Sequence, residues 1–335
     1  MGLPGRALGL GGALFLVLFL SACSNAIQTT RLQQAHPVDL PTRYELADTP
    51  FFAQERYQCG PAALATMLTQ RGLAVHPDQF VGQVYLPARE GSVPIEMEAS
   101  ARRHGMLVYP LAPELEAVLR EVAAGHPVLV LQNLGLDWWP NWHYAVVVGY
   151  DLPQGEIILR SGVTRRYVAS MPVFETTWQR GGHWAQVVVP PGLIPATASP
   201  LPYVRSALDL EQSGQLDAAL ASFRAATARW PQASFAWLAR GNLAYRQGRA
   251  EEAVESFASG VRAAPRDAAL WNNYAYALAR RQCGTQALEA VRCAIALDPE
   301  NPGYRDSLHE LQAVDPGSAT CDMAPCPMAA GESLP

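Results

Sequence analysis

Short apolar runs alternate with turn residues in the central part of the chain, and this pattern predicts β-strands. Five runs are rich in Val, Ile, Leu and Tyr, and each is short enough to be one strand. The predicted strands span 128–131, 144–148, 156–159, 166–168 and 186–189. Turn residues separate successive runs, as in the stretch Asp151-Leu-Pro-Gln-Gly155, so we expect the strands to pair antiparallel.

Helical patterns precede these strands. A proline in the first turn and a glycine stop predict a helix that begins near Gly60-Pro61 and ends before Gly72. Two further helices are expected over 92–103 and 113–124. Because helices come first and strands later, the region from about 46 to 190 is predicted to be an α+β domain with an antiparallel sheet.

A pattern with a period of 34 residues follows a proline-rich linker at 191–202. Residues of four types recur at this spacing: Pro231, Pro265 and Pro299; Trp237 and Trp271; Ala219, Ala253 and Ala287; Phe223 and Phe257. The spacing resembles three tetratricopeptide repeats, in which small residues let paired helices approach and proline ends each pair. A non-repetitive helical bundle fits this period poorly.

We expect the all-α repeats and a capping helix, which starts at 302, over 203–313, and a disordered tail over 314–335. Gln282 stands where the repeat pattern expects glycine, so the turn of the third repeat is expected to be weaker while its helices stay intact. Stacked helix pairs form a concave surface suited to a peptide or a partner protein.

The first 23 residues have the pattern of an export signal. Their apolar run from Leu8 to Leu20 is too short for a stable membrane helix. The closing Leu-Ser-Ala-Cys23 resembles the bacterial lipoprotein box, which implies cleavage before Cys23 and attachment of lipid to it. Ser24, in place of Asp, implies by the same resemblance an outer-membrane lipoprotein facing the periplasm. An ordinary signal with cleavage nearby is the alternative, and 24–45 is expected to be a tether.

Composition narrows the class of protein. With 49% apolar and 16% charged residues, the chain has the balance of a folded protein and is long enough for two domains. Its net charge of −5 comes without a basic block, which argues against a nucleic-acid partner. No Cys-x-x-Cys or His-x-x-x-His spacing is present, so we expect neither a metal nor a cofactor.

The cysteines bear on the cellular compartment. If Cys23 carries lipid and Cys59 stays free, the other four can form two disulfides in an oxidising periplasm. The short-range pairs are Cys283 with Cys293 and Cys321 with Cys326, although sequence alone does not determine the connectivity.

A cysteine at a helix start and a histidine at a strand start form the candidate site. Cys59 precedes Gly-Pro, and exposed N–H groups at a helix N-terminus favour the thiolate. His143 begins a strand that reads His-Tyr-Ala-Val-Val-Val. A thiol becomes a useful nucleophile when a base lies beside it, so the pair predicts nucleophilic catalysis. The alternatives are a buried small hydrophobe for Cys59 and a structural role for His143.

The stretch Gln54…Gln58-Cys59-Gly-Pro-Ala-Ala-Leu, together with His143-Tyr-Ala-Val-Val-Val-Gly-Tyr-Asp, resembles the peptidase C39 family. This is the papain-like domain that trims double-glycine leader peptides in bacteriocin exporters. The resemblance covers about 46–190 and implies a papain-like cysteine peptidase fold. It also implies that Cys59 attacks the peptide carbonyl and that His143 is the general base and later the acid. Gln54 would help to hold the oxyanion, with Gln58 as a competitor for that role.

One position departs from the family pattern. The family usually places an Asp-Pro pair after the next strand to orient the imidazole, whereas this chain has Ser161-Gly162. A hydroxyl accepts a hydrogen bond without carrying charge, so it stabilises an imidazolium less than a carboxylate does. Asp151 lies at the opposite end of the strand from His143. The exporters' membrane spans and phosphate loop are also missing, so the leader-peptide substrate is not inherited with the fold.

Other aromatic and histidine side chains lie near the candidate site in sequence. Trp138, Trp139 and Trp142 flank His143, and they either wall a peptide-binding cleft or fill a core. His183 could also start a strand, but without a partner motif it is expected to be structural.

The sequence therefore predicts an envelope-anchored cysteine peptidase that cleaves a peptide or protein substrate, with the repeats recruiting that substrate or a partner. Acyl transfer to an amine uses the same residues. The alternative from another class is a peptide-binding adaptor that keeps the catalytic fold without turnover, and Ser161 favours it. Redox exchange at Cys59 has less support, because no resolving cysteine lies nearby.

Overall fold

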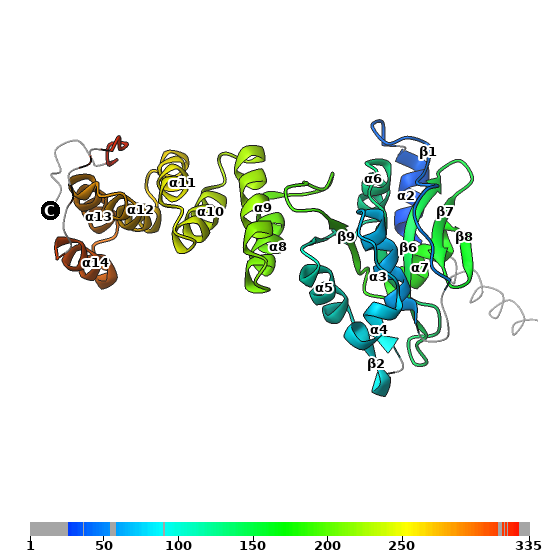
Figure 1. Ribbon diagram of the computed structural model, residues 1–335. Helices are drawn as coiled ribbons and strands as arrows, with labels where there is room; N and C mark the ends of the chain where they lie inside the picture. The colour runs from blue at the N-terminus through cyan, green and yellow to red at the C-terminus, as the bar shows by residue number, and fades with distance from the viewer. Residues whose placement is uncertain are drawn as a thin grey trace, which may run out of the picture. The chain divides into compact units, whose positions relative to one another are not determined.

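The computed structural model describes residues 26–35, 37–53, 58–89, 91–313, 317, 319 and 321–327. The chain divides into two compact units, labelled by their elements in Figure 1. The first comprises residues up to Ser100 together with Pro110–Val188, and the second comprises Ala101–Tyr109 together with the residues from Val189 onward. Among the described residues, no helix is both long and apolar enough to cross a bilayer.

An antiparallel sheet forms the core of the first unit, which confirms the predicted α+β class. Its strands run in the order β9–β5–β6–β7–β8, and β1 pairs with the last residues of β6. Their bounds are β1 (Arg43–Glu45), β5 (Val128–Asn133), β6 (Trp142–Asp151), β7 (Glu156–Ser161), β8 (Thr164–Ser170) and β9 (Ala185–Val189). The residues from Tyr144 to Tyr150 of β6 are all buried, because helices cover this strand.

Helices α3 and α6 pack against β6, and α7 packs against β5 (Figure 1). The helices up to β9 are α2 (Ile27–Ala35), α3 (Cys59–Gln70), α4 (Asp78–Val84), α5 (Pro94–Arg103), α6 (Leu115–Ala123) and α7 (Met171–Arg180). Short pieces complete this region: β2 (Tyr85–Leu86), η2 (Pro87–Arg89), β3 (Gly91–Ser92) and β4 (Leu107–Pro110). Helix α3 is buried from Gly60 to Leu68, since nearly every side chain there is small or apolar.

The segment expected to be a tether over 24–45 is ordered in its described part, which corrects that expectation. Glu175 of α7 accepts hydrogen bonds from the backbone N–H groups of Gln28 at 2.9 Å and Thr29 at 2.7 Å, and from the Thr29 hydroxyl at 2.6 Å. The Gln28 side chain in turn accepts the N–H of Leu115 at 2.5 Å. Helix α2 carries little apolar pattern because polar contacts to distant residues hold it, and such contacts leave no periodic signal.

The second unit contains three helix pairs that keep the predicted 34-residue step, followed by a single helix. These are α8 (Pro200–Gln212) with α9 (Leu216–Arg229), α10 (Ser234–Arg246) with α11 (Ala250–Ala263), α12 (Ala268–Arg280) with α13 (Gly284–Leu297), and then α14 (Pro302–Gln312). Helix α14 occupies the place of the predicted capping helix.

The periodic residues have repeated contacts. The indole N–H of Trp237 donates to the carbonyl of Pro231 at 2.9 Å, and that of Trp271 donates to the carbonyl of Pro265 at 2.7 Å. In the second helix pair, a Cβ added at Gly241 would lie 2.6 Å from the ring of Phe257, so α10 and α11 approach closely there. The 34-residue spacing of tryptophan and proline therefore reflects a local hydrogen bond that occurs at both tryptophans.

Gln282 adopts the backbone conformation of the glycines that it replaces. Its φ is 61°, whereas Gly214 and Gly248, at the equivalent positions of the two preceding repeats, have φ of 81° and 75°. A side chain is strained in this left-handed region, so the turn between α12 and α13 carries a cost that the other turns avoid. Both helices nevertheless form, as expected.

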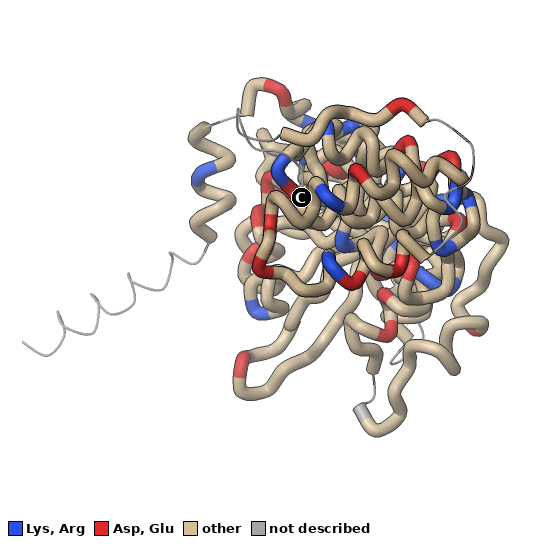
Figure 2. The backbone as a smooth tube through the Cα atoms, turned by 90° about the vertical axis from the view of Figure 1, so that its left-hand side faces the viewer, with Lys and Arg blue, Asp and Glu red and all other residues tan. Residues whose placement is uncertain are grey.

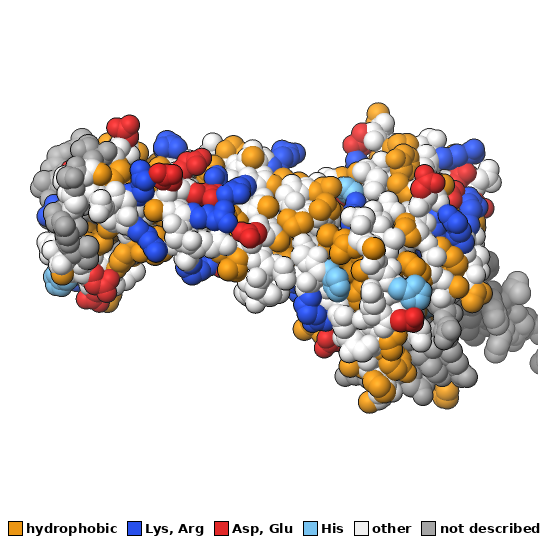
Figure 3. All heavy atoms as spheres, viewed as in Figure 1, with side chains coloured by type: hydrophobic (Ala, Val, Ile, Leu, Met, Phe, Trp, Pro, Cys, Tyr) orange, Lys and Arg blue, Asp and Glu red, His pale blue; other side chains and the backbone are white. Residues whose placement is uncertain are grey.

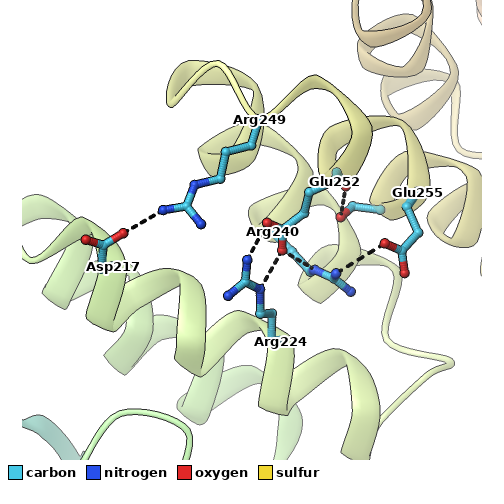
Figure 4. Close-up of polar contacts among 7 residues, drawn as sticks. Asp217, Arg224, Arg240, Arg249, Glu252 and Glu255 are labelled. Carbon is cyan, nitrogen blue, oxygen red and sulfur yellow. Dashed lines mark hydrogen bonds and ion pairs between the residues drawn. The ribbon is translucent and has the colours of Figure 1, made fainter. Parts of the chain in front are cut away.

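An ion-pair network joins α9, α10 and α11 (Figure 4). Glu252 accepts hydrogen bonds from Arg224 at 2.6 and 2.5 Å and from Arg240 at 3.1 Å, while Arg249 pairs with Asp217 at 2.7 Å. The pKa of Glu252 is lowered, and the hydrogen bond from Arg224 contributes most to this shift. Acidic and basic residues are both spread along the chain in Figure 2, and their side chains are interspersed on the face of this unit that Figure 3 shows.

Two disulfides form, but with long-range connectivity. Cys283 bonds to Cys321 with a Cα–Cα distance of 5.8 Å, and Cys293 bonds to Cys326 with a Cα–Cα distance of 5.7 Å. The short-range pairs do not form because Cys283 and Cys293 lie about 15 Å apart along α13 at its rise per residue. The segment 321–327, part of the expected disordered tail, is therefore attached to α13 although it has no regular secondary structure.

Candidate active site

Cys59 is the first residue of α3, with Pro61 in the first turn. Gly60 is required beside it, because an added Cβ would lie 2.1 Å from the hydroxyl oxygen of Ser92. The Ser92 hydroxyl is itself buried and has no hydrogen-bond partner among the described residues. Cys59 is half-buried and is the one free cysteine in the described part of the chain.

His143 is the second residue of β6 and lies opposite Gln132 of β5. Its Nε2 atom lies 2.8 Å from the hydroxyl oxygen of Ser161, the last residue of β7. When Nε2 carries the proton it donates to this oxygen, and Nδ1 is then free to act as a base. The hydroxyl thus occupies the place of the group that orients a catalytic imidazole.

The structure brings Cys59 to the start of β6. Burial raises the pKa of the Cys59 thiol, and the backbone N–H groups of Tyr144, Gly60 and Cys59 itself act in the opposite direction. Because Tyr144 directly follows His143 in the strand, a sulfur within reach of the Tyr144 N–H lies beside the residue that carries the imidazole.

The electrostatics of the pair differ from the expectation of a thiolate stabilised at a helix N-terminus. Burial lowers the pKa of His143 and raises that of Cys59, so both shifts favour the neutral form. The effect of desolvation outweighs the effect of the N–H groups at the start of α3. The resting site therefore holds a neutral thiol and a neutral imidazole, and proton transfer has to accompany attack by the sulfur.

A buried arginine next to Ser161 fixes the end of β7. The guanidinium of Arg160 donates to the carbonyls of Ala47 at 2.8 Å, Thr49 at 3.1 Å and Arg165 at 2.8 Å. These bonds tie the chain before α3 to the strand that presents Ser161. A buried arginine is favourable where several acceptors satisfy it, as they do here.

The remaining residues considered for the site or for lipidation are Cys23, Gln54, Gln58 and Asp151. Gln54 and Cys23 are outside the described residues. Gln58 is the N-cap residue of α3, but its side chain makes no capping hydrogen bond. Asp151 is at the far end of β6 and pairs with Arg43 at 2.9 Å, so it does not serve His143.

His183 lies in the turn between α7 and β9. Its ring packs edge-on against Trp178 with a centroid distance of 4.7 Å, and burial lowers its pKa. This packing agrees with the structural role expected for it. Trp138, Trp139 and Trp142 are exposed, so of the two roles considered for them they do not fill a core.

Sequence reasoning missed three groups at the site. The Tyr144 N–H is a backbone donor, which leaves no signature in the sequence. Arg160 directly precedes Ser161, and an arginine after three apolar strand residues was an available signal of a buried cation. Ser92 lies in the segment that was expected to open a helix, but its contact with Gly60 joins residues far apart in the chain.

Comparisons with known proteins agree with this architecture. Residues 46–185 match the sequence profile of the Peptidase_C39 like family, and residues 204–268 and 238–302 match that of the Tetratricopeptide repeat. A domain that resembles the C39-like peptidases is thus followed by a region that resembles tetratricopeptide repeats, and we call the first the C39-like domain. A similar solved structure is described as a proposed C39-like peptidase from Bacillus anthracis, with 19% sequence identity and a TM-score of 0.38. The match covers 44% of this chain and 97% of that chain. No curated protein matches the chain.

The side chains that could act as metal ligands are the last feature to consider in the described residues. Within the part of the chain that the structure describes, no group of three or more His, Cys, Asp or Glu residues could hold a metal ion.

Proposed function

We propose that the chain is an envelope-anchored cysteine peptidase that cuts a peptide or protein substrate through its C39-like domain. Cys59 is the nucleophile, His143 is the base, and Ser161 orients the imidazole. One observation carries the proposal: His143 Nε2 is 2.8 Å from Ser161 Oγ. The backbone N–H of Tyr144, the residue after His143, acts to lower the pKa of the Cys59 thiol, which supports the proposal.

The chemistry follows from this arrangement. His143 takes the proton of the Cys59 thiol as the sulfur attacks the substrate carbonyl, and the negative charge develops on the carbonyl oxygen. The backbone N–H of Cys59 at the start of α3 and the side chain of Gln54 are proposed to hold that oxygen. His143 then protonates the leaving amine, which leaves a thioester on Cys59. Water assisted by His143 hydrolyses the thioester and restores the thiol.

The location of the enzyme is part of the proposal. Cys23 is proposed to be lipidated, with the protein on the outer membrane facing the periplasm, because Leu-Ser-Ala-Cys23 closes an apolar run. Two disulfides in the repeat unit support an oxidising compartment. The repeats are proposed to recruit the substrate or a partner protein on their concave face.

The test of the peptidase uses the mature chain and a pool of periplasmic peptides. New N-termini are mapped by mass spectrometry after incubation with wild-type protein and with Cys59→Ser. Termini that appear with the wild type and not with Cys59→Ser support hydrolysis, and added amine separates acyl transfer by the mass of the product. Identical termini in both samples would end the peptidase proposal. Mass spectrometry of the membrane-extracted protein and of Cys23→Ser tests the lipid.

A peptide-binding adaptor is the second candidate, and the uncharged Ser161 favours it. Burial favours the neutral form of both members of the pair, and among the described residues no carboxylate partner of the imidazole compensates. Iodoacetamide distinguishes the two functions, since Cys59 is the free thiol of the described chain. In an enzyme, His143→Ala slows the labelling of Cys59 at pH 7; in an adaptor the two proteins react at the same rate as an unassisted thiol.

A further inference from the structure

The loop between β5 and β6 exposes a dense set of large apolar side chains. We call residues 134–142 the tryptophan loop. Its exposed members are Leu134 (47%), Leu136 (47%), Trp138 (77%), Trp139 (73%) and Trp142 (52%). Single apolar residues on a surface are ordinary, but five within nine consecutive positions form a contiguous patch of the kind that marks a binding site.

Hydrogen bonds hold the base of this loop. The side-chain oxygen of Asn133 accepts from the backbone N–H groups of Gly135 at 2.9 Å and Asn141 at 2.8 Å. Leu136 and Trp139 exchange two backbone hydrogen bonds, of 3.1 and 3.0 Å, which place Asp137 and Trp138 at the tip of a tight turn. The loop is therefore a small closed hairpin.

Packing fixes the hairpin further. A Cβ added at Gly135 would lie 2.3 Å from the carbonyl oxygen of Trp139, so only glycine fits there. Arg180 of α7 donates to the Gly135 carbonyl at 2.8 Å and attaches the hairpin to the domain. The rings of Trp138 and Trp139 pack edge-on at a centroid distance of 6.4 Å. Side chains held in place before binding lose little entropy when a ligand arrives.

The strand register places the tryptophan loop beside the candidate base. Trp142 lies opposite Asn133, and the next pair along the same two strands is His143 opposite Gln132. The exposed loop thus leads directly into the residue whose Nε2 contacts Ser161. An exposed apolar loop that adjoins a candidate peptidase site along the chain is best matched by the substrate itself.

The charge of the tryptophan loop indicates that it binds a peptide and not a bilayer. Asp137, at the tip, is the one charged residue between 134 and 142, and the segment contains no arginine or lysine. Loops that bind anionic membranes usually add basic residues to their tryptophans, and an acidic tip is repelled by such a surface. The tryptophan loop therefore fits an uncharged apolar side chain better than lipid headgroups.

We propose that the tryptophan loop is the specificity subsite of the C39-like domain and holds a large apolar or aromatic side chain of the peptide substrate next to the bond that is cut. This inference rests on the proposed function, since it names the substrate class of that site. Aromatic residues on such a surface supply large contact areas at low entropic cost.

The test measures binding without turnover. Titration calorimetry uses the full mature chain carrying Cys59→Ala and two peptides, acetyl-Ala-Ala-Ala-Phe-Ala-Ala-Ala-amide and the same peptide with Ala in place of Phe. The Phe peptide is expected to bind at least about tenfold more tightly, and Trp138→Ala with Trp139→Ala is expected to remove that advantage. Tyr167→Ala removes an aromatic side chain from a 48% exposed position on β8, and it is expected to leave the advantage of the Phe peptide unchanged.

The other outcomes are equally defined. Equal binding of both peptides, or an advantage that survives in the loop variant with its circular dichroism unchanged, overturns the subsite. The subsite is also overturned if the loop variant loses only its binding to phosphatidylethanolamine–phosphatidylglycerol vesicles. The same holds if the loop variant sediments as a monomer where the parent protein sediments as a dimer. Loop-dependent peptide binding without cleavage by the wild-type protein keeps the subsite and removes the peptidase, so the two proposals fail separately.

Discussion

The protonation states of Cys59 and His143 decide the reactivity of the candidate site. Burial stabilises the neutral form of each group, so the resting pair is a thiol and an imidazole rather than an ion pair. Ser161 adds orientation through its 2.8 Å contact but contributes no charge. In the proposed mechanism His143 therefore has to take the proton during attack by Cys59, which makes the reaction sensitive to the protonation of both groups.

The first prediction concerns pH. His143 assists Cys59 only while the imidazole is neutral and the thiol is protonated. Its pKa lies below the ordinary 6.5, and that of Cys59 lies above the ordinary 9.0. The ratio of iodoacetamide labelling rates, wild type over His143→Ala, is expected to be high between these values. It should fall toward one below pH 6.5, as the imidazole is protonated, and above pH 9.0, as the thiol ionises unaided. A ratio that stays near one throughout contradicts the role of His143.

The second prediction restores the charge that the chain lacks. Ser161→Asp places a carboxylate beside Nε2, which favours the imidazolium and raises the pKa of His143 by about one unit or more. Proton transfer from Cys59 becomes easier, and labelling at pH 7 is expected to rise by about tenfold. Ser161→Asn, of similar size and without charge, is the control and should not accelerate labelling. If both variants behave alike, charge is not what limits the site.

The residues of the candidate site could be named from the sequence, whereas their energetics could not. Cys59 before Gly-Pro and His143 at a strand start follow from local motifs, whereas Ser161 follows from the resemblance, because it stands where the family has an Asp-Pro pair. The direction of the cysteine pKa did not follow, because it depends on how deeply α3 and β6 are buried against each other. Gln54 remains a prediction, since it lies outside the described residues.

At the scale of elements, the turn between α12 and α13 is the one turn within the three helix pairs that lacks glycine at its left-handed position. The third prediction is that Gln282→Gly stabilises the repeat unit by about 1 kcal/mol, because it relieves a left-handed residue at φ 61°. Thermal unfolding followed by circular dichroism measures the change. Gly248→Ala, at the equivalent turn with φ 75°, is the matched control and should destabilise by a similar amount. If Gln282→Gly fails to stabilise the repeat unit although Gly248→Ala destabilises it, the strain at Gln282 is absorbed elsewhere.

The fourth prediction concerns the ion-pair network of α9, α10 and α11. Hydrogen bonds from Arg224 and Arg240 lower the pKa of Glu252 below its ordinary 4.5. Its stabilisation is therefore present above pH 4.5 and is lost as the pH falls through the lowered value. Glu252→Gln is expected to destabilise the repeat unit by about 1 kcal/mol at pH 7 and by less at pH 3. Urea unfolding at the two pH values measures this, with exposed Glu251→Gln as the control. An equal loss at both pH values would indicate a packing effect instead.

Elements with strong apolar patterns were predictable, and those held by polar contacts were not. The five predicted strands all lie within observed strands. Four of them carry apolar runs that are buried in the sheet, whereas β8 is mostly exposed. Helix α2 was missed because Glu175, well over a hundred residues away, holds its first turn. Helix α7 carried a usable signal in Ser170 followed by Pro172, which marks a helix start.

At the scale of the whole molecule, the disulfides stabilise one unit and not the other. Both bridges lie in the repeat unit and close loops with sequence separations of 38 and 33 residues. A loop of this length contributes about 3–4 kcal/mol in the chain-entropy account. The pairing could not be read from sequence, because it depends on the tail returning to α13.

The fifth prediction follows from that asymmetry. Reduction with a phosphine is expected to lower the melting temperature of the repeat unit by about 10 °C or more and to leave the C39-like domain unchanged. The rate at which Cys59 reacts with iodoacetamide after removal of the reductant reports on the domain. Cys321→Ser with Cys326→Ser should reproduce the effect without reductant. An equal loss in both units would contradict this assignment.

The docking of α2 sets a working distance for the whole protein. Ile27 begins a helix attached to α7 and lies only four residues after Cys23, a span of at most about 14 Å when extended. If an acyl chain on Cys23 enters the outer membrane, these few residues hold the C39-like domain close to the membrane surface. Its targets then have to arrive at the inner leaflet, so a lengthened spacer after residue 25 should widen the range of substrates.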